Sequence, residues 1–469
     1  MANTGSSISA PLKRAAGAVQ AAPRDGFATG LGVLTATLGS AVGLGNIWKF
    51  PFLTGANGGA AFLIVYLIST LLVGLPVMIS ELTMGRTARA DAITTLQKLS
   101  PSRKPWWLIG AIGALSAFMI LAFYTEVAGW VFAYIFKSLS AAALSTNPEV
   151  TSQAFSGLVT DPVQSLVWQW IVLGLVGFII ILGVSKGIEN TTKRLMPVLF
   201  LLLVAVCVRS LTLPGAAKGL EFLLKPDFSK VTGLTMLTAM GLAFFKLSIG
   251  MGTMITYGSY FREDQNIPIT ATRVMLADLS VSLLAGMAIF PAVFAFGFEP
   301  SAGPSLLFIT IPAVFASMPL GHFFMVIFFI LAAIAATGAM LSLFEVPVAY
   351  MSERLGMSRR TATLLTMALL VLFGSAAALS NSVLADFKVL GMTMFDLYDF
   401  TTSNIFLPVG GIFICLFVGW VWGMDQVKKS LSNNGILKNE GIARLFLFLV
   451  RFVSPVLILL VLLQGLNIL

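Results

Sequence analysis

Long apolar runs recur through almost the whole chain, and they constrain the fold more than any other feature of the sequence. A transmembrane helix needs about 20 mostly apolar residues to cross the hydrocarbon core of a bilayer. Eleven runs reach this length, at 27–52, 60–84, 106–136, 163–184, 195–213, 233–260, 274–298, 320–350, 360–380, 400–424 and 443–467. We therefore predict an all-α polytopic membrane protein with eleven spans.

The charge content excludes a set of soluble domains and a nucleic-acid-binding protein. Only 10% of the 469 residues are charged, whereas a soluble domain has about 25%. The net charge of +9 comes from Lys and Arg in short loops, without a basic stripe or a nucleic-acid motif. Cys207, Cys415 and His322 do not form a metal-ligand pattern, and we see no nucleophile–base set. We expect no enzyme activity and no cofactor.

The distribution of Lys and Arg predicts the orientation in the membrane. Alternate loops are rich and poor in these residues, and the rich side faces the cytoplasm. Residues 1–26 lack the apolar core of a signal peptide, so we expect a cytoplasmic N-terminal tail. Residues 425–442 would form a cytoplasmic loop, and 443–469 the eleventh helix, with the C-terminus outside. We expect this arrangement in the inner membrane of a bacterium.

Two of the predicted spans carry glycines that would interrupt a helix. Gly43 and Gly45 lie in the first span, and Gly250 and Gly252 lie in the sixth. Matched interruptions in two halves of a chain indicate a transporter built from repeats, with substrate held at the breaks. The predicted transporter core is 27–424, with helices 1–5 at about 27–213 and helices 6–10 at about 233–424. Because each repeat has an odd number of helices, the second copy would be inverted.

Several specific motifs resemble the neurotransmitter:sodium symporter family. They are Gly39-Ser-Ala-Val-Gly-Leu-Gly-Asn-Ile-Trp-Lys-Phe-Pro51, Asn57-Gly-Gly-Ala60, Glu81-Leu-Thr-Met-Gly-Arg86, Thr256-Tyr-Gly-Ser-Tyr260 and Phe395-Asp-Leu-Tyr-Asp399. The resemblance runs from about Arg24 to the C-terminus. It implies the inverted-repeat fold of the bacterial leucine transporter, with discontinuous helices 1 and 6. Some bacterial members have eleven helices, as predicted here.

The resemblance implies alternating access, with an amino acid bound at the membrane midplane. The implied substrate-binding residues are Ser40, Ala41, Gly43, Leu44, Gly45, Ile120, Tyr124, Phe245, Lys246, Ser248, Met251, Ala339 and Leu343. Tyr124 would donate its hydroxyl to a carboxylate, and Phe245 would form a lid. Amine-transporting members have Asp at the position of Gly43, so its absence favours a substrate with its own carboxylate. The implied gates are Lys49 with Asp399 outside and Arg24 with Glu353 inside.

The two sodium sites depart from the family pattern. Ala41, Asn46, Lys246 and Asp278 occupy the positions of the first site, and Lys246 stands where the family has a hydroxyl. Gly39, Val42, Ala335, Gly338 and Ala339 occupy those of the second site. Gly338 and Ala339 replace two hydroxyl residues, and Thr337 lies one residue early, about 100° around a helix. We expect Lys246 to replace the first ion, and sodium coupling to be weakened or lost.

Several alternatives stay open. Lys246 and Asp278 could form a static pair, or Lys246 could titrate and link transport to protons. A conventional sodium symporter could keep its second site through Thr337, and a transport-inactive ligand sensor would share the fold. Tyr66 and Ser282 match chloride-site positions, but Asp278 already supplies a negative charge, so we expect no chloride requirement. The expected partners are a small-molecule substrate and membrane lipid, and a homodimer is left open.

Overall fold

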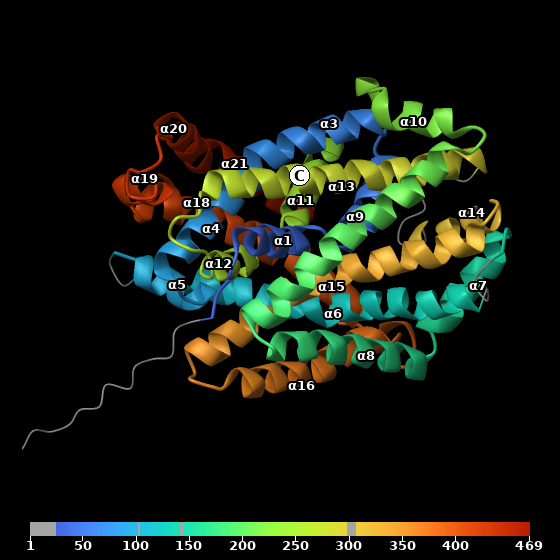
Figure 1. Ribbon diagram of the computed structural model, residues 1–469, viewed down its shortest axis with the longest axis horizontal. Helices are drawn as coiled ribbons and strands as arrows, with labels where there is room; N and C mark the ends of the chain where they lie inside the picture. The colour runs from blue at the N-terminus through green and yellow to red at the C-terminus, as the bar shows by residue number, and fades with distance from the viewer. Residues whose placement is uncertain (1–24, 102–103, 141–144, 298–305) are drawn as a thin grey trace, which may run out of the picture.

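Long helices that run mostly along one axis dominate the fold (Figure 1). The computed structural model describes residues 25–101, 104–140, 145–297 and 306–469. Within these ranges, nine helices are long and apolar enough to cross a membrane. They are α3–α4 (Ala60–Ser69 and Leu75–Ala88), α6 (Trp107–Leu139), α8 (Pro162–Ile181), α9 (Asn190–Leu211), α13 (Ile267–Ala295), α15 (Gly321–Glu353), α16 (Arg359–Ala378), α17–α18 (Met394–Phe400 and Leu407–Leu416) and α20–α21 (Glu440–Phe448 and Ser454–Gly465). The predicted all-α polytopic membrane fold is confirmed.

Two further apolar segments are broken helices in the interior. The first consists of α1 (Gly30–Ala41), a π-helical segment (Gly45–Lys49) and α2 (Phe50–Ala56), with a bend of 51° at the break. The second consists of α11 (Gly233–Lys246) and α12 (Thr253–Gly258). Helix α1 packs against α9, α13 and α15, and α12 packs against α4 and α15. The long helices therefore enclose both breaks, which are the predicted interruptions of helices 1 and 6.

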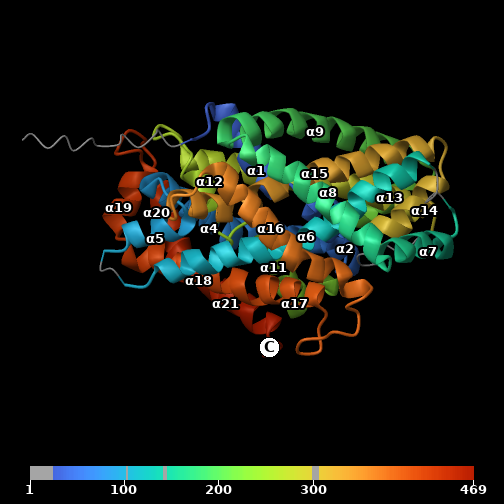
Figure 2. The ribbon, with the colours of Figure 1, turned by 90° about the horizontal axis from the view of Figure 1, so that it is seen from below.

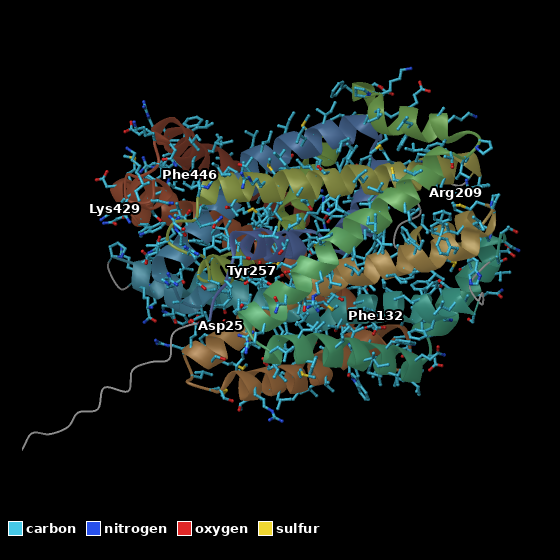
Figure 3. The ribbon with its side chains drawn as sticks, in the orientation of Figure 1. Asp25, Phe132, Arg209, Tyr257, Lys429 and Phe446 are labelled. Atoms are coloured by element: carbon cyan, nitrogen blue, oxygen red, sulfur yellow. The ribbon has the colours of Figure 1, made fainter. Side chains whose placement is uncertain are left out.

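Short helices cover the two ends of the bundle (Figure 2). Helices α5 (Ala92–Leu99) and α19 (Met424–Leu431) lie at one end, and α7 (Pro148–Val159) and α14 (Ile311–Ala316) lie at the other, where α10 (Ala216–Leu224) also lies. Figure 3 labels Lys429 at the first end and Arg209 at the second. The apolar runs did not predict these helices, because each of them is too short to cross a bilayer.

Several helices begin before the predicted apolar runs. Helix α13 begins at Ile267 rather than near 274, because the Asn266 side chain accepts a hydrogen bond from the Ile269 N–H and Pro268 favours the first turn. Helix α20 begins at Glu440, and α17 begins at Met394 after the Thr393 cap. In each case the helix begins several residues before the predicted apolar run.

Glycines allow α4 and α12 to pack backbone to backbone. A Cβ atom on Gly85 would lie 2.0 Å from the carbonyl oxygen of Ile255, and one on Gly258 would lie 2.6 Å from that of Leu82. These distances are far below van der Waals contact, and backbone atoms cannot rotate away. Close helix packing at small residues is typical of membrane proteins. The contact fixes α12, and with it the second break, against α4.

We expect Gly85→Ala to lower stability by about 1–3 kcal/mol, as overpacking usually does. The added methyl group would force α4 and α12 apart. Gly174→Ala in α8 is the matched control, because its Cβ would meet no atom within 4 Å. Unfolding in mild detergent measures both effects. An unchanged stability of Gly85→Ala would contradict the close contact.

Candidate functional site

The first break exposes backbone groups beside a tyrosine hydroxyl. The Leu44 N–H donates to the Tyr124 hydroxyl oxygen at 2.9 Å. The Gly43 N–H donates to the Asn46 side-chain oxygen at 3.3 Å. A Cβ on Gly43 would lie 3.0 Å from the Tyr124 hydroxyl and 3.1 Å from the Ala339 Cβ. Glycine at position 43 therefore lets the Tyr124 hydroxyl and Ala339 lie close to the first break, and the space beside Gly43 is small.

The second break is a non-helical stretch between α11 and α12 that needs unusual backbone angles. Ser248, Gly250 and Gly252 have φ values of 53°, 79° and 75°. Glycine adopts such angles at little cost, whereas serine rarely does. The Ser248 hydroxyl donates to the Ser40 carbonyl at 2.8 Å, which joins the two breaks directly. The Gly250 N–H donates to the buried Glu81 carboxylate at 2.6 Å.

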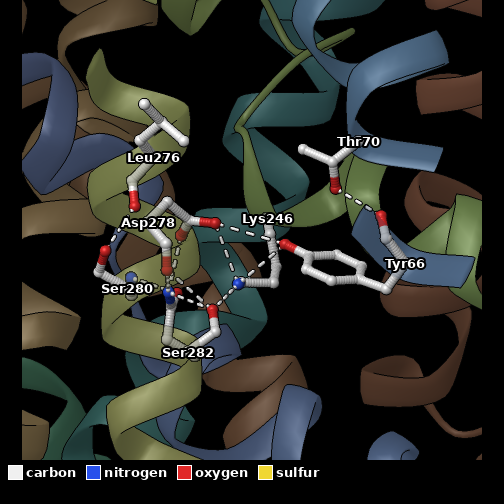
Figure 4. Close-up of polar contacts among 9 residues, drawn as sticks. Tyr66, Thr70, Lys246, Leu276, Asp278, Ser280 and Ser282 are labelled. Atoms are coloured by element: carbon white, nitrogen blue, oxygen red, sulfur yellow. Dashed lines mark hydrogen bonds and ion pairs between the residues drawn. The ribbon is translucent and has the colours of Figure 1, made fainter. Parts of the chain in front are cut away.

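Lys246, the last residue of α11, places its ammonium group between α3 and α13 (Figure 4). Its Nζ lies 3.0 Å from Asp278 Oδ2 and 3.0 Å from the Tyr66 hydroxyl, and it also donates to Ser282 Oγ. The side chains of Lys246 and Asp278 are both 0% exposed. Three partners match the three donors of an ammonium group. This buried cation is therefore fully hydrogen-bonded.

Asp278 joins Lys246 to the first break. Its Oδ1 accepts a hydrogen bond from the Asn46 side-chain amide at 2.6 Å, and its Oδ2 faces Lys246. The same amide lies 3.2 Å from Ser282 Oγ. Three of the four residues implied for the first sodium site thus lie in one network, and the fourth, Ala41, ends α1. Tyr66 and Ser282, which match chloride-site positions, contact the ammonium group.

Most residues implied for the substrate site are buried around the two breaks. The buried ones are Ser40, Ala41, Gly43, Leu44, Gly45, Ile120, Tyr124, Lys246, Ser248, Met251, Ala339 and Leu343. Phe245 is half-buried, and its ring lies 3.7 Å from the Cβ position of Gly45. The Ser40 hydroxyl donates to Ser342 Oγ at 2.8 Å, which is a contact that the sequence did not reveal.

The positions of the second sodium site lie where α1 meets α15. A Cβ on Gly338 would lie 2.7 Å from the Gly39 carbonyl oxygen. This close approach leaves no room for a side chain at 338. The Thr337 hydroxyl donates to the Ala333 carbonyl of its own helix at 2.8 Å. Val42 lies directly after α1, and Ala335 and Ala339 lie on α15. All three residues are buried.

The two residues implied for the outer gate have partners other than each other. Lys49 Nζ lies 4.2 Å from the centre of the Phe245 ring, and the Asp399 carboxylate accepts from Ser403 at 2.8 Å. No ion pair joins Lys49 to Asp399 in the part of the chain that the structure describes. The Glu353 carboxylate accepts the Asp91 N–H at 2.8 Å. Arg24 lies outside the described residues.

Sequence reasoning missed one ion pair between the interior of α15 and the start of α16. Arg359 Nη2 lies 2.5 Å from Glu345 Oε2, and Glu345 is fully buried. The Tyr260 hydroxyl also donates to Glu345, at 2.6 Å. An acidic residue inside a predicted span is a functional candidate by default. Glu345 carried that signal in the sequence, as did Glu81.

Comparisons with known proteins place this geometry among sodium-dependent transporters. Residues 24–154 and 154–468 match the sodium:neurotransmitter symporter family. YhdH of Bacillus subtilis, described as an uncharacterized sodium-dependent transporter, is 38% identical over 445 residues, covering 94% of this chain and 98% of that protein. An uncharacterized sodium-dependent transporter of Haemophilus influenzae is 34% identical over 438 residues, covering 91% and 95%. The crystal structure of MhsT in complex with L-phenylalanine is similar with a TM-score of 0.86, at 41% identity over 94% of this chain and 100% of that chain.

Proposed function

This chain belongs to the sodium:neurotransmitter symporter family, and we propose that it transports a small amino acid or amino-acid-like carboxylate, with Lys246 in place of the first sodium ion. The family and the leucine-transporter fold make it an integral membrane transporter. Transport would occur by alternating access around the two breaks.

The position of the Lys246 ammonium group carries the proposal. It lies 3.0 Å from Asp278, whose other carboxylate oxygen accepts from Asn46. A sodium ion held by Asn46 and Asp278 would be a close neighbour of this ammonium group. Two unit charges about 4 Å apart repel by about 4 kcal/mol at an effective dielectric constant of 20. We therefore infer that the ammonium group supplies the positive charge that sodium provides elsewhere.

Three structural features support a substrate with a carboxylate. The Tyr124 hydroxyl oxygen accepts from the Leu44 N–H, so its proton remains available for a carboxylate oxygen. The segment Gly45–Lys49 begins at this point, and the start of a helix favours a negative charge. The short distances from the Cβ position of Gly43 indicate little room for an acidic side chain there. L-phenylalanine bound to the similar MhsT agrees with an amino acid as the substrate.

A conventional sodium symporter is the second candidate function, favoured by relatives that are described as sodium-dependent. In that case sodium would bind only at the second site. The absence of a hydroxyl at Gly338 and Ala339 weighs against this site, because a hard cation needs oxygen ligands.

We place the end that carries α5 and α19 on the cytoplasmic side of a bacterial inner membrane, because basic loops gather there.

The test is thermal stabilisation of the purified protein by pooled amino acids, followed by uptake of the identified ligand into proteoliposomes. We expect stabilisation by at least one amino acid, and uptake of that ligand. Stabilisation without uptake would indicate a ligand sensor. Stabilisation by no amino acid would contradict the proposed substrate class.

We expect Tyr124→Phe to weaken substrate binding by about 10- to 100-fold, because a hydrogen bond to a charged group contributes about 1.5–3 kcal/mol. The substitution also leaves the Leu44 N–H without its acceptor. Isothermal titration calorimetry with the identified ligand measures the change. Tyr134→Phe is the matched control, because Tyr134 is also buried in α6 but its hydroxyl donates to the Phe308 carbonyl. Equal affinity for Tyr124→Phe and wild type would remove Tyr124 from the carboxylate site.

A further inference from the structure

A basic cavity lies between α19 and the start of α20, and no residue of the two breaks lines it. Its volume is about 780 Å³, and its lining includes Lys428, Lys429, Lys438 and Arg444. Glu440 is the one acidic residue of that lining, and it forms a 4.0 Å ion pair with Arg444. The three lysines have no ion-pair partner within the described residues. The cavity therefore carries an uncompensated positive charge of three lysines.

A second basic cavity lies at the opposite end of the molecule, and two of its lysines form ion pairs. It is lined by Lys218, Lys225 and Lys230 together with Glu221 and Asp227. Lys225 lies 2.8 Å from Glu221, and Lys230 lies 3.9 Å from Asp227. The hydrogen bond and the charge of Glu221 raise the pKa of Lys225. In this second cavity the positive charge is largely compensated.

The basic cavity has a fixed frame. Arg86 at the end of α4 donates to the Asn433 side-chain oxygen at 2.7 Å and also to the Ser430 carbonyl. Asn433, Asn434 and Gly435 then have φ values of 50°, 58° and 89° in succession. Asn and Gly tolerate these left-handed angles better than other residues. This turn reverses the chain after α19, so that Lys438 returns to the same cavity as Lys428 and Lys429.

The cavity also lies at the membrane surface. The loop that forms it joins two spans, one that ends at Val421 and one that begins at Glu440. Figure 3 labels Lys429 of α19 at the end of the molecule and Phe446 on the following helix, α20. On α20, Leu445 and Phe448 are 60% and 54% exposed, so apolar side chains adjoin the basic ones. This combination suits a phosphate headgroup whose acyl chains extend along the last span.

We propose that this cavity binds the headgroup of an anionic phospholipid from the adjacent leaflet. Basic pockets at the cytoplasmic ends of transmembrane helices recognise such headgroups, and each Lys near the surface adds to the attraction. The phosphate would be bound by Lys428, Lys429 and Lys438, and the apolar side of α20 would contact the acyl chains. A bound lipid would hold α19 and α20 together. The proposal is independent of the transported substrate.

The test is binding of short-chain phosphatidylglycerol to the purified full-length protein in neutral detergent, followed by native mass spectrometry and by thermal unfolding. Phosphatidylcholine of the same chain length and free glycerol 3-phosphate are the two comparison ligands. We expect phosphatidylglycerol alone to bind and stabilise the wild type. The triple variant Lys428→Gln/Lys429→Gln/Lys438→Gln should need at least about tenfold more of this lipid for the same stabilisation. The reason is that each lysine near an anionic surface adds to the binding free energy.

Two further variants keep the test decisive. Lys218→Gln/Lys225→Gln/Lys230→Gln removes three lysines from the opposite end and should bind the lipid like wild type. Lys428→Arg/Lys429→Arg/Lys438→Arg keeps the charge and should also retain binding. Equal losses in the two Gln triples would overturn the proposed site. Equal binding of phosphatidylcholine, or of glycerol 3-phosphate alone, would overturn the anionic lipid as its ligand.

Discussion

Asp278→Asn should lower the free energy of unfolding by about 3–5 kcal/mol, because it leaves a buried cation without its counter-charge. The Lys246 ammonium group would keep Tyr66 and Ser282 as partners, but both are neutral. Neither compensates the charge in a site where both side chains of the pair are 0% exposed. Chemical unfolding in mild detergent measures the loss.

The double variant Lys246→Met/Asp278→Asn is the matched control for the charge. It removes both charges, so most of the lost stability should return, as it does when buried ion pairs are replaced by uncharged residues. Glu221→Gln breaks an exposed pair with Lys225 and should leave unfolding unchanged. If Asp278→Asn were as stable as wild type, Lys246 would be uncharged in the folded protein.

Lys246→Thr should make substrate binding depend on sodium. The substitution removes the ammonium group and supplies a hydroxyl oxygen beside Asn46, Asp278 and the carbonyl end of α1. Sodium is a hard cation that prefers such oxygen ligands. Coupling between two bound ligands is typically about 5- to 150-fold in affinity. We therefore expect substrate affinity in sodium to exceed that in choline by a factor within this range.

Lys246→Met separates the two effects of Lys246→Thr, which are the loss of the ammonium group and the gain of a hydroxyl oxygen. It removes the charge without adding an oxygen, so substrate binding should weaken and should not respond to sodium. Titration of the ligand in matched sodium and choline buffers measures both variants. If Lys246→Thr bound substrate equally in the two salts, then position 246 would not belong to a cation site.

The architecture could be predicted from the sequence because membrane helices carry a strong and local signal. Apolar length predicted the spans, and the pairs Gly43/Gly45 and Gly250/Gly252 predicted the two breaks. The all-α transporter fold and the family are confirmed. The end helices such as α7 and α10 were not predicted, because neither their length nor their apolar content distinguishes them from loops.

The site could be predicted only at the level of residue types. A Lys where the family has a hydroxyl, with an Asp on another helix, indicated a charge in the first sodium site. The partners of that charge depend on side-chain directions across α3, α11 and α13, which spacing along one helix does not determine. The contacts of Lys246 with Tyr66 and Ser282 therefore emerged only from the structure. Lys49 likewise lies over Phe245, although the family pattern pairs it with Asp399.

Binding of the identified amino acid to the wild-type protein, compared in sodium and in choline, tests the role of Lys246 most directly. If the ammonium group replaces the first sodium ion, the affinities in the two salts should be equal within error. A repeat at a second pH would then reveal any linkage to protons. Strict dependence on sodium would contradict binding without sodium, and it would favour the conventional symporter that binds sodium at the second site.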